Sequence, residues 1–414
     1  TPVRPDFMNS VTTPAMRGSN HVGMRQFNER IVLQAIRHHG AIPKADLARL
    51  TQLSTQTVAI IVGRLEGDGL LIKQERVRGK IGQPSVPLSL NPQGAFGVGI
   101  QVGRRKLEWL VADFCGQPVQ RLEMHYDYPD PETLFASVAQ GLQTLQSRMG
   151  ELWTRTVGVG LTAPLSLHKW ADLMGGQAAR ALAQWEHIDL ADQVQRLTDL
   201  PVVFAKDTTA ACVAELLQGQ GRSQRSFLYV FVGTFIGGGL VLAGHIMGGE
   251  RGNAGAIGSL PVGLASPHAA PGVGMPPQLL QQASGWQLEQ ALLAAGYDPL
   301  LKHQTAIMDE AYASLTGPWI AQASQALAMT VASAAALLDL DAVVMDGSLG
   351  APLMAALTQA TQEALAGYRF DGMHQPAVLS GQVGPHARAL GGALLPLHSQ
   401  FFPDKDIFLK QDAA

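Results

Sequence analysis

A glycine-rich stretch near the middle of the chain has the composition of a phosphate-binding turn. It reads GTFIGGGL at residues 233–240 and follows the apolar run FLYVFV at residues 227–232. Glycine lets a backbone approach an anion closely, and successive N–H groups of such a turn can cradle a phosphate. These residues alone leave two interpretations open. The chain transfers phosphate from ATP, or it keeps only the fold of a protein that did.

A second group of residues is suited to contact nucleic acid. The segment STQT at residues 54–57 opens an apolar-periodic helix, and small polar side chains at the start of a helix can reach base edges and phosphates. A basic stretch at residues 76–80 can neutralise phosphates or reach a minor groove. The candidate DNA-binding residues are Ser54, Thr55, Gln56, Thr57, Arg64, Arg76, Arg78 and Lys80.

Three helices and a hairpin are predicted to position this second group. Helical spacing occupies residues 27–39 and 43–52 and the segment 53–71, with Ser54 as the N-cap of the third helix and with Leu47 and Leu50 of the second facing inward. The buried side of the third helix is predicted to consist of Val58, Ile61, Val62 and Leu65. Residues 70–90 are typical of two short strands with a basic tip. This is the winged helix-turn-helix arrangement, whose third helix enters the major groove. A winged helix used only for protein contacts is the alternative.

Charge and composition bound the class of protein. Residues 1–85 hold 12 Lys and Arg against 6 Asp and Glu, while the remainder has a net charge of −9. A basic head on an acidic body indicates a polyanionic partner, although chance drift is the alternative. We find no signal peptide, no apolar run of membrane-spanning length and no CxxC pair between Cys115 and Cys212. We therefore expect a cytoplasmic protein with no membrane partner, and a flexible arm at residues 1–20.

Beyond a linker rich in proline and glycine, near residue 88, strand-like and helical segments alternate. The segments AFGVGIQV, TVGVGLTA, PVVFAK, FLYVFV and AVVMDGSL read as strands, and PETLFASVAQGLQTLQSRM reads as an amphipathic helix. Such alternation is typical of an α/β architecture. The length of this body favours two lobes with a cleft between them.

The order of motifs resembles that of a known family. The motifs are GQPSVPLSLN, VGIQVG, GVGLTAP, KDTTAACVAE, VFVGTFIGGGLVLAGHIMGG, NAGAIGS and GPHARALGGALL, within residues 21–400. They resemble those of the ROK family of sugar-responsive repressors and sugar kinases. The resemblance implies an actin- and hexokinase-like (ribonuclease H-like) body that binds a sugar between two lobes, and a homodimer or homotetramer. The expected domains are a winged helix-turn-helix at 21–88, a first lobe at 89–208 to which 390–414 returns, and a second lobe at 209–389.

One departure from the family bears on catalysis. ROK kinases carry Asp-x-Gly-Gly-Thr in the first hairpin, for ATP phosphates and metal. This chain has QVGRR there, with Gln101 in place of the Asp and with Arg104 and Arg105 in the turn. A neutral amide does not replace a carboxylate in organising magnesium, and arginines fill a turn that needs glycine. We therefore expect ATP binding to be lost, with no catalytic residue and no cofactor.

The sugar end of the expected cleft departs from the family as well. Asp207 matches the general base of the kinases, but Lys206 replaces the Asn before it. The alternative role of Asp207 is a structural ion pair with Lys206 or Arg251. In AGAIGS, Ala256 and Ser259 replace a sugar-binding Glu and a zinc-linked His. The cysteine-rich zinc loop is absent, and His268 alone cannot form a tetrahedral zinc site, so no metal is expected. The effector-binding residues that the resemblance implies are Lys206, Asp207, Asn253, Ala256, Ser259, Arg251 and Thr162.

These features favour a DNA-binding transcriptional regulator of carbohydrate uptake or metabolism genes, more a repressor than an activator. Because the Glu is lost and Lys206 is gained near Arg251, the hypothesised effector is an anionic or differently shaped sugar, such as a sugar phosphate or sugar acid. The alternative to an effector of this kind is a degenerate pocket that binds no ligand. A ROK sugar kinase with a fused DNA-binding head is the alternative function. A third possible function is an interaction module that binds no ligand.

Overall fold

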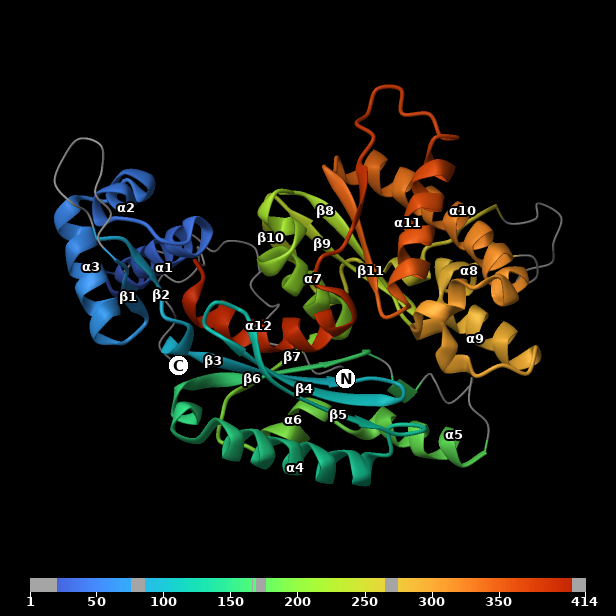
Figure 1. The fold of residues 1–414 in the computed structure, drawn as a ribbon, viewed down its shortest axis with the longest axis horizontal. Helices are drawn as coiled ribbons and strands as arrows, with labels where there is room; N and C mark the ends of the chain where they lie inside the picture. Colours follow the sequence, from blue (N-terminus) through green and yellow to red (C-terminus); the bar gives the residue numbers. More distant parts are fainter. Residues whose placement is uncertain (1–20, 76–85, 166, 169–175, 265–274, 404–414) are drawn as a thin grey trace. The chain divides into compact units, whose positions relative to one another are not determined.

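The computed structural model describes residues 21–75, 86–165, 167–168, 176–264 and 275–403. The chain forms two compact units. The first unit runs to Ala205 and resumes at Gly392, and the second unit extends from Lys206 to Gly391. Figure 1 shows the elements of both, which are described here one unit at a time.

The first unit begins with three helices and a two-stranded sheet, together called the head. These elements are α1 (His21–His39), α2 (Lys44–Thr51), α3 (Thr55–Gly67) and the antiparallel strands β1 (Leu71–Lys73) and β2 (Leu88–Leu90). The predicted buried side of α3 and its N-cap Ser54 are confirmed. The prediction for Leu50 is wrong, because this two-turn helix is covered only around Leu47 and Leu50 is 50% exposed. Arg76, Arg78 and Lys80 lie outside the described residues.

A five-stranded sheet forms the centre of the rest of the first unit. Its order is β5-β4-β3-β6-β7, with bounds β3 (Phe96–Val102), β4 (Lys106–Asp113), β5 (Pro118–His125), β6 (Thr156–Ala163) and β7 (Val202–Lys206). Strand β3 pairs antiparallel with β4 and parallel with β6. The register places Gln101 between Glu108 on β4 and Thr162 on β6. Three polar side chains are therefore adjacent on one sheet face.

Helices cover both faces of this sheet. Helix α4 (Pro131–Met149) packs Leu134, Val138, Leu142 and Leu145 into a core with β3, β4 and β6, and the short helices α5 (Gly176–Ala183) and α6 (Leu190–Gln195) follow. Helix α12 (Ala387–Phe401) continues from Gly392 across the opposite face (Figure 1). A Cβ at Gly97 or Gly160 would overlap the backbone of α12, so these two glycines allow the helix to lie directly on β3 and β6.

The second unit has a five-stranded sheet of order β10-β9-β8-β11-β12. The bounds are β8 (Phe227–Val232), β9 (Ile236–Leu242), β10 (His245–Met247), β11 (Ala342–Gly347) and β12 (Ala377–Ser380). Strand β11 runs parallel to β8 and β12, whereas β8–β9 and β9–β10 are antiparallel. Strands β8 and β11 are buried throughout, as is usual for strands covered on both faces. Sequence patterning missed β12, whose four residues are too few to show a period.

The helices of the second unit are α7 (Asp207–Gln218), α8 (Leu279–Ala283), α9 (Gly285–Ala294), α10 (Ala313–Leu338) and α11 (Ala351–Leu365). The segment Glu310–Leu338, which contains α10, is long and apolar enough to cross a membrane. This corrects the expectation that no apolar run has that length. Trp319, Ala323, Leu327 and Val331 of α10 are buried in the core of the second unit. The same length and composition therefore also suit a core helix.

Candidate functional site

The turn between β3 and β4 carries the residues expected to disrupt a phosphate clamp. The N–H of Gly103 donates to the carbonyl of Lys106 at 2.8 Å, and the Tyr126 hydroxyl donates to the carbonyl of Gly103 at 2.6 Å. Gln101 is 1% exposed and Arg104 is 8% exposed. The turn is thus a closed hairpin, and the side chain of Arg104 lies within the protein.

The amide group of Gln101 is buried in this hairpin. Neither its nitrogen nor its oxygen has a hydrogen-bond partner among the described residues. The nitrogen would lie 3.0 Å from a Cβ at Gly103, so the amide folds against the turn. The carboxylate beside it in register, Glu108, is neutralised by Lys106 Nζ at 2.7 Å and Arg121 Nε at 2.9 Å. The hairpin therefore presents a neutral amide at the position where the resemblance implies a magnesium-organising carboxylate in ROK kinases.

The β8–β9 turn uses its backbone to hold α9. The carbonyls of Gly233 and Thr234 accept from the N–H groups of Gly285 and Trp286, both at 2.9 Å. The N–H of Ile236 donates to the Ser284 hydroxyl at 3.0 Å. Sequence reasoning missed Ser284. The glycine-rich stretch thus has a structural task of its own in this chain.

The glycines of β9 also allow α7 to pack closely. A Cβ at Gly237 would lie 2.8 Å from Thr208 Cγ2, and one at Gly239 would lie 2.5 Å from Cys212 Cβ. The Thr208 hydroxyl donates to the carbonyl of Gly238 at 3.0 Å. This contact fixes the N-terminal end of α7, where Asp207 is the first residue.

A charged cluster surrounds this end of α7. Asp207 Oδ1 accepts from the N–H of Thr208 at 2.8 Å, and Oδ2 lies 3.4 Å from Arg388 Nη1 on α12. Lys206 Nζ donates to Asn253 Oδ1 at 3.2 Å. Burial lowers the pKa of Lys206, and the neighbouring Asp207 carboxylate opposes that effect. With two cationic side chains and one carboxylate, the cluster has an excess of positive charge.

The other expected effector residues are spread more widely. Arg251 and Ser259 are exposed and Ala256 is half-buried, all in the second unit. Thr162 is buried in the first unit, where its hydroxyl donates to the carbonyl of Ile100 at 3.4 Å. The partner of Asp207 is Arg388, which sequence reasoning missed although it stands in GPHARALGG. Among the described residues, no three His, Cys, Asp or Glu side chains are grouped as metal ligands; His268 lies outside them.

The expected DNA-binding residues on α3 fall into two groups. Thr55 and Gln56 are exposed. Ser54 accepts from the N–H of Thr57 at 3.1 Å and lies 2.8 Å from its hydroxyl, so this pair forms the helix cap. Arg64 forms an ion pair with Glu29 on α1. The side chains that point outward at the start of α3 are thus those of Thr55 and Gln56.

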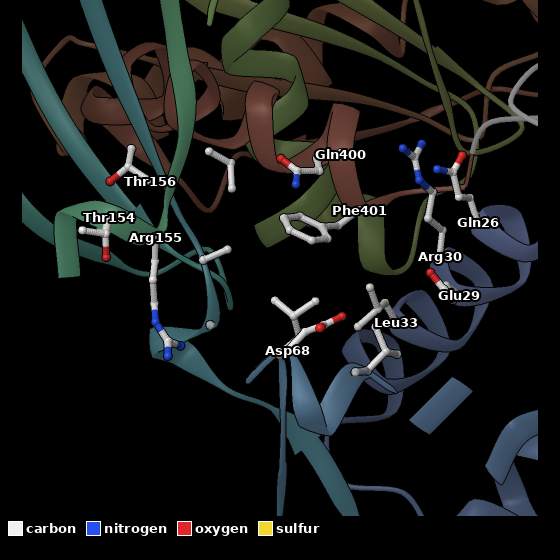
Figure 2. A pocket seen from close by; sticks show the side chains of 15 residues that line it. Gln26, Glu29, Arg30, Leu33, Asp68, Thr154, Arg155, Thr156, Gln400 and Phe401 are labelled. Atoms are coloured by element: carbon white, nitrogen blue, oxygen red, sulfur yellow. The ribbon is translucent and has the colours of Figure 1, made fainter. Parts of the chain in front are cut away.

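A hollow of about 560 Å³ lies where the head meets the rest of the first unit (Figure 2). Gln26 and Arg30 of α1 line it, as do Asp68, Arg155 and Phe401.

Beside the hollow, α1 is joined to the end of α12. Arg37 Nη2 donates to the carbonyl of Phe114 at 2.8 Å, and its guanidinium carbon lies 5.5 and 4.7 Å from the ring centroids of Phe114 and Phe402. Arg30 Nη1 donates to the carbonyl of Phe402 at 3.1 Å. These contacts attach the head to α12.

The comparison that decides the family covers the whole second unit and about half of the first. The model of the ROK family matches residues 97–398. The chain belongs to the ROK family. This confirms the resemblance drawn from the ordered motifs, and with it the mixed α/β, kinase-like ROK body.

Named relatives include both regulators and kinases. The xylose repressor of Bacillus subtilis is 22% identical over 249 residues, which is 60% of this chain and 64% of that protein. A glucokinase of Halalkalibacterium halodurans is 28% identical over 167 residues, 40% of this chain and 49% of that protein. The match thus spans less than two thirds of each of these proteins. Regulator relatives support a sugar-responsive ROK regulator, while kinase relatives leave phosphorylation open.

A solved structure resembles almost the whole chain. It is that of a ROK family transcriptional regulator described as a homologue of the E. coli MLC protein, with a TM-score of 0.67 at 20% identity. The match covers 92% of this chain and 97% of that one. At this identity the likeness shows the fold alone.

Proposed function

We propose that this ROK protein is a transcriptional regulator whose head binds operator DNA and whose body senses a carbohydrate-type effector. The observation that carries the proposal is the β3–β4 hairpin, where the buried amide of Gln101 stands in place of the kinases' carboxylate and Arg104 is packed inside. In this proposal the body does not bind magnesium nucleotide and instead binds an effector. The head converts effector binding into a change in DNA binding. The head is a winged helix-turn-helix in this proposal, and the protein acts in the cytoplasm as a homodimer or homotetramer.

The charged cluster at α7 supplies the effector chemistry. Asp207 and Asn253 are hydrogen-bonding partners for sugar hydroxyls, and Lys206 and Arg388 favour a ligand that carries a carboxylate or phosphate. Thr162, Arg251, Ala256 and Ser259 complete the proposed effector-binding set. A ligand that binds one conformation of the body more tightly than another then shifts the population of that conformation.

Helix α12 offers a continuous route from the effector cluster to the head. Arg388 in its first turn contacts Asp207 in the second unit. The same helix enters the first unit at Gly392, and Phe402, just beyond its end, contacts Arg37 of α1. We propose that this helix transmits effector binding to the spacing of two heads on operator half-sites, about one or two helical turns apart.

Three measurements on the full chain test the proposal. Selection from a random duplex pool should enrich a DNA sequence with two half-sites. Isothermal titration with D-xylose, D-glucose, glucose 6-phosphate and gluconate should give heat with at least one of them, and binding should change the DNA affinity. Flat heats for all four contradict the effector, and failure to enrich any duplex contradicts the DNA-binding function.

A ROK sugar kinase with a fused head is the second candidate. Asp207 keeps its place at the start of α7, beside a retained glycine-rich β8–β9 hairpin. A coupled ADP-release assay with the same neutral sugars separates the two functions. Robust turnover would favour the kinase.

A further inference from the structure

The outward face of α3 combines an apolar side chain with two glycines. Opposite the buried side of the helix, spacings of three and four residues align Gln56, Ile60, Gly63 and Gly67. All four are exposed, and Ile60 is 58% exposed. Ile60 is not among the DNA-binding candidates that the sequence offered.

Gly63 has no structural reason to be glycine within the described protein. It lies inside α3, and a Cβ built there would meet nothing within 4 Å. Glycine inside a helix lowers the folded population relative to alanine by up to about fivefold, because the unfolded backbone has more entropy to lose. At an exposed position of this kind, glycine leaves room for the close approach of another molecule. Gly67, one turn further, is equally open.

Ile60 lies beside a small hollow between α3 and α1. The hollow has a volume of about 260 Å³, and Met24 of α1, itself 47% exposed, lines it with Ile60 and Thr57. Single exposed apolar residues are ordinary on protein surfaces. Here two of them, Met24 and Ile60, border one hollow, and Gly63 lies one turn after Ile60 without a side chain to cover it. Met24 and Ile60 thus form a small apolar patch with polar residues around it.

We infer that this face of α3 reads the major groove of double-stranded DNA and that Ile60 packs against the 5-methyl group of a thymine. The inference rests on the proposed DNA-binding function. The thymine methyl is the apolar group that the major groove displays, and Gln56, one turn earlier on the same face, can pair with the edge of an adenine. Gly63 lets the DNA approach the helix closely. The positive charge of residues 1–85, with 12 Lys and Arg against 6 Asp and Glu, matches this partner.

Removing one methyl group from the DNA tests the contact directly. The probe is the duplex that the full chain enriches from a random pool, remade with each thymine replaced singly by uracil. We expect one position in each half-site to weaken wild-type binding by about fourfold, the effect of one buried methyl group. Ile60→Ala should bind more weakly and be indifferent to uracil at that position. Leu337→Ala, which truncates an 82% exposed leucine on α10, is the matched control and should keep the wild-type response.

A second variant tests the role of the glycine. Gly63→Ala should make the head more resistant to unfolding and yet weaken binding to the same duplex by tenfold or more. This combination is diagnostic because a structural defect would lower both the stability and the DNA affinity. Gly317→Ala, at another exposed helix glycine with nothing within 4 Å, should leave DNA binding unchanged.

The outcomes separate this inference from the proposed function. A duplex that is enriched but insensitive to uracil at every position, or equally sensitive with Ile60→Ala, overturns the inference and leaves DNA binding in place. Undiminished DNA binding by Gly63→Ala overturns it too, and capture of a protein by this face instead of DNA does the same. If no duplex is enriched, the proposed function fails and the inference fails with it.

Discussion

Arg388 on α12 pairs with Asp207 at the start of α7, with Nη1 3.4 Å from Oδ2. The guanidinium carbon of Arg388 also lies 4.8 Å from the ring centroid of Phe231. The pair is mostly buried, with 19% and 11% of the two side chains exposed. The carboxylate that matches the general base of ROK kinases is thus partly neutralised by an arginine.

Arg388→Met should lower the free energy of unfolding by about 1–2 kcal/mol, because it leaves the Asp207 carboxylate buried with less compensation. Urea unfolding measures this. The control is Arg196→Met, which removes an ion pair to Asp192 whose side chains are 67% and 52% exposed, and it should cost less than about 0.5 kcal/mol. Equal losses in the two variants would show that the Arg388 pair has no special role.

Gln101→Met should raise the free energy of unfolding by about 1 kcal/mol, because it replaces a buried amide without partners by an apolar side chain of similar shape. Gln195→Met is the contrast. Gln195 donates to the carbonyls of Thr198 at 3.2 Å and Leu200 at 3.0 Å and accepts from Val202 N–H at 2.9 Å, so its replacement should destabilise the protein. A loss of stability in Gln101→Met would mean that the amide is hydrogen-bonded in solution.

Arg37→Met should loosen α1 without unfolding the body. It removes the hydrogen bond to the Phe114 carbonyl and the cationic contacts with the rings of Phe114 and Phe402. Those interactions are together worth about 1–2 kcal/mol, so amide hydrogens of α1 should exchange about tenfold faster. Arg49→Met, at a position 78% exposed, is the control and should leave exchange in α1 unchanged. Unchanged exchange in Arg37→Met would argue against α12 as the route to the head.

Lys206 gives a prediction for alkaline pH. Burial lowers its pKa below the ordinary value of 10.5, so the folded state releases this proton at a lower pH than the unfolded state does. The unfolded state then binds more protons in that window, and stability rises with pH. As pH falls through the lowered pKa, this contribution is lost. Relative to Lys206→Met, the wild type should gain unfolding free energy as the pH rises towards 10.5. Parallel stability curves for the two proteins would contradict the shift.

Local patterns predicted much of the fold because they report local causes. The period of apolar residues in α3 gave its buried side, and Ser54 gave its cap. The prediction that Leu50 is buried was wrong because the short helix α2 is covered only around Leu47. The helical period does not reveal how much of a helix is covered. Strand β12 was not predicted because its four residues form a parallel pair with β11 and depend on that neighbour for stability.

The candidate site was predicted less completely, for a related reason. The resemblance identified Gln101 and Lys206 as departures from the ROK kinase motifs and Asp207 as a match, because each residue stands inside a short motif. It gave no indication that Arg388, 181 residues further along, would pair with Asp207. Nor did it show that the glycines of β9 serve the packing of α7.

The sequence by itself determined the order of the elements, the family and the chemical types available at each motif, because these follow from local periodicity and from the residues written there. Only the tertiary structure decided which charges meet and which side chains face outward. Those outcomes depend on contacts between segments far apart in the chain. Asp207 finds Arg388 through the packing of α7 and α12, and Ile60 and Gly63 are left uncovered because the rest of the head packs against the other side of α3.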